Sequence, residues 1–114
     1  MTNLSMNRKM KYQTRNEIIN QMRFSNRSGG HCNCFRAYAS ESNIHIRKKF
    51  EKWLELMKDG WDIWTEVIFI DGSRADIIAF KDGLWKGIEI VVSEKVVDCR
   101  EKIKKYPQID WEII

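Results

Sequence analysis

Apolar residues recur most regularly between positions 41 and 58, at intervals of three or four residues. This spacing predicts an amphipathic helix with one face toward the core. Ser40 or Ser42 can cap its first turn, and Gly60 suits the left-handed position that follows a helix. The apolar stripe expected to face the core comprises Ile46, Phe50, Trp53, Leu54 and Met57.

Strand-like segments follow this helix. Residues 61–70, 74–80 and 84–92 are rich in β-branched and aromatic side chains, and turn sequences at 71–72 and 81–83 separate them. Alternation in the first strand predicts one face made of Ile63, Thr65, Val67 and Phe69 and an opposite face made of Trp64, Glu66, Ile68 and Ile70. The third strand is almost continuously apolar toward its end, which indicates burial on both faces.

The remaining segments complete an α/β pattern. A helix is expected from Ser93 to about residue 105, ended by Pro107, and a last strand at 109–114. A strand, a helix and a strand in succession favour a crossover, so the last two strands should be parallel. A short helix is also expected at residues 14–24. The predicted fold is α/β, with a mixed four-stranded sheet flanked by helices in the order α-β-β-β-α-β.

The size of the chain favours one domain. It has 114 residues, 43% of them hydrophobic, which is enough for one compact core. We expect a basic N-terminal segment at residues 1–30, partly helical or flexible, followed by a single domain at residues 31–114. No apolar run approaches the roughly 20 residues that span a bilayer, and the N-terminus lacks an apolar signal-peptide core. The composition therefore predicts a cytoplasmic protein without a membrane span.

Positive charge is concentrated in the N-terminal third. Residues 1–36 carry a net charge of +6, whereas the whole chain carries +4. Such a segment favours a polyanion, so DNA is the expected partner, and a solvated tail is the alternative. The candidate DNA-binding residues are Arg8, Lys9, Lys11, Arg15, Arg23 and Arg27, together with Arg74.

The cysteines, Cys32, Cys34 and Cys99, do not form a spaced disulfide framework. His31 adjoins Cys32, so metal-capable side chains are concentrated at that point. A closed zinc site needs four ligands, commonly in two pairs, and the second pair is missing. Structural Zn²⁺ is therefore not expected, and a zinc-stabilised nucleic-acid adaptor is kept only as a further alternative.

Asp76 and Glu89 are carboxylates inside apolar sequence, on strands that should be neighbours. Burying an unpaired carboxylate is costly, and two that approach each other repel unless a cation lies between them. Such oxygen ligands suit Mg²⁺, and also Mn²⁺. A surface ion pair between Asp76 and Arg74 is the structural alternative. The two acids therefore predict a divalent-metal site of the kind that hydrolyses phosphodiesters.

Glu41, His45 and Lys49 are spaced four residues apart, so a helix would align them. Glu41 is the expected third acidic group of the metal site, with Glu51 and Glu66 as rivals. His45 can carry a proton, and Lys49 can steady a phosphate or the attacking water. The alternative is a solvated helix face with an internal charge pair.

Three motifs follow one another along the chain: Glu41-Ser42-Asn43-Ile44-His45-Ile46-Arg47-Lys48-Lys49, Arg74-Ala75-Asp76-Ile77 and Ile88-Glu89-Ile90-Val91-Val92-Ser93. Within residues 31–106, their order and spacing resemble the PD-(D/E)XK nuclease superfamily and are similar to the nuclease domain of CoiA-like competence proteins. The resemblance implies a restriction-endonuclease-like core and magnesium-dependent DNA cleavage. It also implies Asp76, Glu89 and Glu41 as metal ligands, with His45 and Lys49 as further catalytic residues.

One position departs from the superfamily pattern. That pattern places Lys, or Gln in some relatives, two residues after the strand Glu, and this chain has Val91 there. Lys49 is the first candidate to replace it, and Lys95 and Lys102 are others. Without such a lysine the protein would be a catalytically weak or inactive DNA-binding module, which is the alternative function. An active nuclease of this size is expected to form a homodimer in order to cut both strands.

Overall fold

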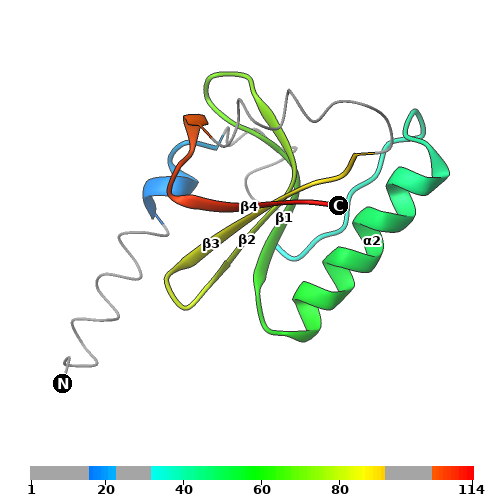
Figure 1. Cartoon of the computed structure of the whole chain (residues 1–114), viewed down its shortest axis with the longest axis horizontal. Coiled ribbons are helices and arrows are strands. Elements are labelled where there is room, and N and C mark those ends of the chain that lie inside the picture. Colours follow the sequence, from blue (N-terminus) through cyan, green and yellow to red (C-terminus); the bar gives the residue numbers. More distant parts are fainter. Residues whose placement is uncertain (1–15, 23–31, 92–103) are drawn as a thin grey trace.

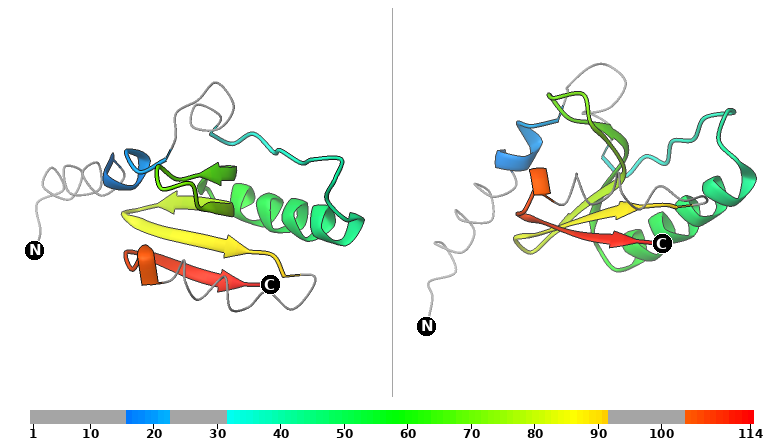
Figure 2. Two further views of the ribbon diagram at one scale, coloured as in Figure 1. Left: turned by 90° about the horizontal axis from the view of Figure 1, so that it is seen from above. Right: turned by 45° about the horizontal axis from the view of Figure 1, so that its top comes forward.

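The computed structural model describes residues 16–22, 32–91 and 104–114. Its centre is a sheet in the order β1-β2-β3-β4, formed by Asp62–Ile68, Arg74–Lys81, Leu84–Glu89 and Ile109–Ile113. β1 to β3 are antiparallel neighbours, whereas β3 and β4 are parallel. Helix α2, at Asn43–Lys58, lies on one side of the sheet (Figure 1), and a helical turn at residues 16–19 lies on the other (Figure 2). The predicted α/β class, mixed sheet and parallel pair are confirmed, while most of the helix expected after strand β3 lies outside the described residues.

The hairpin between β2 and β3 has the conformation that its sequence predicts. Lys81 pairs with Leu84, so Asp82 and Gly83 alone form the turn. Both have positive φ, 51° and 84°, as a two-residue type I′ turn requires. This short turn fixes the register of the two strands that carry Asp76 and Glu89.

The ends of α2 are set by local capping. The Ser42 hydroxyl accepts the His45 N–H at 3.1 Å, and Gly60 follows the helix with φ 86°. Both features agree with the predicted caps. The helix has 16 residues, and none of the helices in the described part of the chain has the length and apolar character needed to cross a bilayer.

The buried face of α2 differs from the predicted stripe. Phe50 and Met57 are 44% and 40% exposed, whereas Lys49 and Leu56 are buried. Phe50 packs edge-on against Phe35, with ring centroids 5.2 Å apart, instead of reaching the sheet. The helix is rotated toward Lys49 because this lysine finds carboxylate partners beneath the helix, which a buried charge requires.

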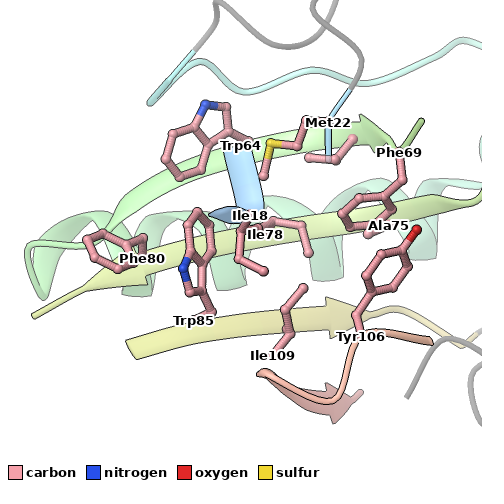
Figure 3. Close-up of a cluster of buried hydrophobic side chains, with 11 residues drawn as sticks. Ile18, Met22, Trp64, Phe69, Ala75, Ile78, Phe80, Trp85, Tyr106 and Ile109 are labelled. Carbon is pink, nitrogen blue, oxygen red and sulfur yellow. The ribbon is translucent and has the colours of Figure 1, made fainter. Parts of the chain in front are cut away.

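Apolar side chains fill both faces of the sheet. The smaller cluster, which includes a side chain of α2, comprises Leu56, Ile63, Ile77, Ala79 and Ile88. The larger cluster (Figure 3) comprises Ile18, Met22, Trp64, Val67, Phe69, Ala75, Ile78, Phe80, Trp85, Tyr106 and Ile109. Residues 16–22 belong to this packed unit, since Ile18 is fully buried and Met22 forms a β-bridge with Phe69. β3 lies between β2 and β4 and is buried on both faces, as predicted.

The alternation of faces along β1 breaks at Glu66. Ile63 lies in the smaller cluster, but Val67 and Phe69 join Trp64 in the larger one. The predicted division of β1 into two regular faces is therefore wrong after residue 65. The left-handed backbone of Glu66, with φ 53°, lies at this break. β2 exchanges faces at the facing position, Asp76, since Ala75 lies in the larger cluster and Ile77 in the smaller one.

Gly87 provides a test of the packing between β3 and β4. It pairs with Trp111 on β4, and a Cβ at this position would overlap the Trp111 ring. Gly87→Ala should therefore lower the free energy of unfolding by about 1–3 kcal/mol through overpacking, measured by urea denaturation. In a Trp111→Leu background the same substitution should cost much less, because the ring is gone. Wild-type stability of Gly87→Ala would contradict the packing described.

Candidate functional site

The strands separate at one level of the sheet, marked by Glu66, Asp76 and Glu89. The β1–β2 ladder skips the facing positions Glu66 and Asp76, although it continues on both sides of them. The β2–β3 ladder ends with the pair Ile77 and Ile88, one residue before Asp76 would meet Glu89. The registers therefore place these acidic residues side by side on three neighbouring strands.

Asp76 occupies the gap in the ladder with its side chain. Its Oδ2 accepts the N–H of Ile90 at 2.8 Å, and its Oδ1 lies 3.5 Å from Nε2 of His45. Arg74, two residues earlier on β2, is exposed, whereas the contacts of Asp76 run to a backbone amide and to His45. Asp76 is held instead by a backbone amide that follows β3, and it faces the first turn of α2.

Glu89 ends β3 and is only 5% exposed. The backbone around it is tied to the end of β4, because the Glu89 carbonyl accepts the N–H of Ile114 at 2.9 Å. Val91 donates its own N–H to the Ile114 carbonyl at the same distance. At this burial a carboxylate needs a partner or a cation. The position of Glu89 is thus fixed by β4 as well as by its own strand.

The sequence predicts that Glu41 begins the helix, but Glu41 lies one residue before the Ser42 cap of α2. Its side chain still reaches the first two turns of the helix. Both of its carboxylate oxygens accept from Nζ of Lys49, at 2.8 and 2.9 Å. The N–H of Tyr38 donates to Oε1 at 2.8 Å and fixes the same carboxylate from the preceding segment. The side chains of Glu41, His45 and Lys49 are therefore in contact, as their spacing predicts.

Lys49 is completely buried, although it carries an amine. Its Nζ lies 2.5 Å from Oε1 of Glu66 and 5.5 Å from the centre of the Phe35 ring. A buried charge is tolerated when it is both paired and hydrogen-bonded. Glu41 and Glu66 meet that need from two different elements, so Lys49 links the start of α2 to β1.

His45 connects two carboxylates. Its Nδ1 lies 2.5 Å from Oε2 of Glu41, and its Nε2 faces Asp76. A protonated imidazole has two N–H groups and can donate to both. The side chain is 20% exposed, whereas Lys49 is sealed from solvent. His45 is the most exposed member of this group, which we call the α2–sheet cluster (Glu41, His45, Lys49, Glu66 and Asp76).

The glutamates that flank Lys49 have pKa values shifted in opposite directions. Burial raises the pKa of Glu66, the hydrogen bond from Lys49 does not cancel that rise, and the charges of Glu41 and Asp76 add to it. Burial also raises the pKa of Glu41, but hydrogen bonds, above all from Lys49, outweigh burial and hold this pKa below its ordinary value. Negative charge is therefore better compensated at Glu41 than at Glu66.

The carboxylates of Asp76 and Glu89 are the donors that best fit a divalent ion. Mg²⁺ is commonly held by one or two carboxylates, with water completing its shell. Both oxygens of Glu41 accept from Lys49, so this carboxylate is held beside the lysine. Among residues 16–22, 32–91 and 104–114, no three His, Cys, Asp or Glu side chains are grouped so as to hold an ion. These residues therefore allow a two-carboxylate site with water ligands, in which Glu41 acts through Lys49.

Sequence reasoning located much of the α2–sheet cluster but undervalued Glu66. That residue was expected only as a rival third acid, and on the wrong face of β1. A signal was present, since Glu66 is an acidic residue inside an apolar strand. Glu51, the other rival, is exposed on α2 and does not join the cluster. No pattern in the sequence predicts the contact between the Phe35 ring and Lys49, because this contact depends on how the segment before α2 folds over the helix.

Other predicted candidates lie away from the cluster or cannot be placed. The basic residues Arg8, Lys9, Lys11, Arg15, Arg23 and Arg27 are outside the described residues, as are His31, Lys95, Cys99 and Lys102. Arg74 is exposed at the start of β2. Cys34 is also exposed, and its backbone forms a parallel β-bridge with Trp64 on β1.

Comparisons of the chain with protein-family models, with curated proteins and with solved structures gave no match. The protein's function is therefore inferred from the positions and contacts of its own residues.

The opposite pKa shifts predict opposite pH dependences of stability. A glutamate whose pKa is lowered on folding, such as Glu41, stabilises the fold above the ordinary value of 4.5 and loses that contribution as the pH falls. A glutamate whose pKa is raised, such as Glu66, favours folding most below 4.5 and less as the pH rises through its folded value. Glu41→Gln should therefore lose more stability relative to wild type at pH 7 than at pH 4, and Glu66→Gln should lose less.

Urea unfolding of both variants and of the wild type between pH 4 and pH 7 measures these differences. Glu51→Gln serves as the matched variant of an exposed glutamate on α2. Trends of the same sign for Glu41→Gln and Glu66→Gln would contradict the shifts described for this cluster.

Proposed function

We propose that this protein is a metal-dependent DNA nuclease that hydrolyses phosphodiester bonds and has a restriction-endonuclease-like core. The observation that carries the proposal is the strand register, which places Asp76 and Glu89 at facing positions where the strands separate. The buried Lys49 is linked to Asp76 through Glu41 and His45. Acidic and basic groups gathered at one point suit a reaction in which a phosphate gains negative charge. The strand order, with β4 parallel to β3, agrees with the core that the motif resemblance implies.

A Mg²⁺ or Mn²⁺ ion bound by Asp76 and Glu89 would supply neutralisation of the phosphate charge and activation of the attacking water. The proposed roles of Lys49 and His45 depend on where their side chains lie. Lys49 places a positive charge beside that site, at a point set by Glu41 and Glu66. Nε2 of His45 faces Oδ1 of Asp76, so it is the atom at which a proton can enter or leave.

DNA is the proposed substrate because the basic N-terminal third supplies charge for phosphate contacts. Exposed Arg74, at the start of β2, is close in sequence to Asp76 and adds to that charge near the site. A homodimer would present two such sites, one for each strand of a duplex. Dimerisation is thus part of the proposal for duplex substrates, whereas a monomer suffices for a single strand.

The second candidate function is a catalytically inactive DNA-binding module. Complete burial of Lys49 favours it, because an amine enclosed by Glu41, Glu66 and the Phe35 ring has to become accessible before it contacts a phosphate. Val91, in place of a strand lysine, favours it as well. An assay of cleavage of single-stranded, duplex and branched DNA with magnesium or manganese separates the two functions.

The first prediction from this proposal concerns the metal ligands. Asp76→Asn and Glu89→Gln should each lower magnesium-dependent cleavage by about 10²- to 10³-fold or more, because an amide cannot supply the charge that holds the ion. Asp110→Asn, a change at an exposed position of β4 that pairs with Lys86, is the matched control and should cut like the wild type. Wild-type cleavage by either Asp76→Asn or Glu89→Gln would remove that residue from the site.

The second prediction concerns the replacement for the strand lysine. Lys49→Met keeps the apolar stem but removes the charge, and should lower the cleavage rate by about 10²-fold if this lysine stabilises the developing charge. The neighbouring change Lys48→Met is the control. Val91→Lys added to Lys49→Met should restore part of the rate by returning a cation beside Glu89. Full activity of Lys49→Met, in a protein shown to be folded by its thermal unfolding, would show that Lys49 has no catalytic part.

A further inference from the structure

Glu66 has a backbone conformation that its residue type disfavours. Its φ of 53° lies in the left-handed region, which costs a residue with a side chain about 1–2 kcal/mol. In the described part of the chain, the other non-glycine residues with positive φ are Asn33 and Asp82. Those two lie in turns and belong to the types that tolerate this region, whereas Glu66 lies within β1. An outlier of this kind persists when the surrounding structure compensates for it, and it often marks a functional position.

The compensation at Glu66 is its contact with Lys49. Regular alternation would have turned this carboxylate toward the face of Trp64, into the larger apolar cluster. The left-handed backbone turns it toward α2 instead, where Oε1 lies 2.5 Å from Nζ of Lys49. The side chain is 13% exposed there, so the contact is largely shielded from water. The strained backbone thus brings the Glu66 carboxylate, which faces Asp76 in the strand register, to the buried ammonium of Lys49.

We propose that Glu66 is a positioning residue of this site: its left-handed backbone exists to hold the Lys49 ammonium between two carboxylates and next to Asp76. This inference rests on the proposed function and deepens it. Glu41 forms an ion pair with Nζ from the segment before α2, and Glu66 forms one from the sheet. With one carboxylate the amine could swing about the lysine stem; with two, on different elements, its place relative to Asp76 is fixed. Such fixed charges are the ones that stabilise a transition state without reorganising.

A purely structural role is the competing explanation. In that case the left-handed turn would serve only to keep a carboxylate out of the larger apolar cluster. The two roles differ in what happens when the carboxylate and the strain are removed together. Glu66→Gly does this, because glycine adopts positive φ without a steric cost and has no side chain to place.

The test compares Glu66→Gly, Glu66→Gln and the control Glu51→Gln in the full-length protein with magnesium. A positioning role predicts that Glu66→Gly, which is less stable because the buried Lys49 loses one partner but is still folded at the assay temperature, has a kcat about 10- to 100-fold lower than the wild type, as for lost outer-shell partners, with KM changed little. Glu66→Gln, which keeps a hydrogen-bond acceptor, should recover part of kcat. Wild-type kcat in Glu66→Gly would overturn the proposal and leave Glu66 with a structural role.

A second measurement does not depend on cleavage. Lysine-selective ¹⁵N NMR detects ammonium protons that exchange slowly because the amine is buried and hydrogen-bonded. The Lys49 ammonium signal should be present in the wild type and in Glu51→Gln, and lost in Glu66→Gly. If the wild type fails to cut DNA with any divalent ion, the proposed nuclease function fails by itself. Loss of the signal in Glu66→Gly then still supports the positioning of Lys49, and its persistence overturns it.

Discussion

The ammonium group of Lys49 has no access to water, so the protein has to surround it with carboxylates. Glu41 provides one from the segment before α2, and Glu66 provides the other from β1. Removal of one partner of a buried ion pair commonly costs about 3–5 kcal/mol, since an uncompensated charge is left behind. The rotation of α2 on the sheet is therefore set by a polar contact. The apolar side chains adjust to it, which is why Phe50 stays half-exposed and packs on Phe35.

The same contact organises the opposite face of the sheet. Because Glu66 faces α2 through a left-handed backbone, Val67 and Phe69 point into the larger cluster. Phe69 then stacks on Tyr106, with ring centroids 4.2 Å apart, and pairs with Met22. Burial of a side chain such as Val or Phe contributes about 1.5–3 kcal/mol, which is enough to offset the strain of roughly 1–2 kcal/mol at Glu66. Residues 16–22 therefore dock on a surface to which Val67 and Phe69 contribute.

These dependences explain which features the sequence could predict. Helix α2, the strands and the parallel pairing of β3 with β4 follow from local periodicity and from the handedness of crossovers. The contacts of Glu41 with His45 and Lys49 follow from helical spacing. The face of Glu66 does not, because alternation assumes an ordinary strand and nothing in the neighbouring residues signals positive φ. Hydrophobicity likewise favours Phe50 over Lys49 as the inward residue, since the carboxylates that reverse this order come from distant segments.

The position of this lysine also bears on Val91. A lysine two residues after Glu89 would lie on the same strand segment as Glu89. The distance between its charge and this metal ligand would therefore not depend on how α2 packs. Lys49 instead reaches the site from the helix, and its distance from Asp76 depends on how α2 packs on β1. Under the proposed hydrolysis, catalysis is therefore coupled to helix docking. A module that only bound DNA through its basic segment would gain nothing from a strained Glu66, so the strain favours chemistry at this point of the sheet. The burial of Lys49 adds one requirement to that chemistry, because the amine has to become accessible before it contacts a phosphate.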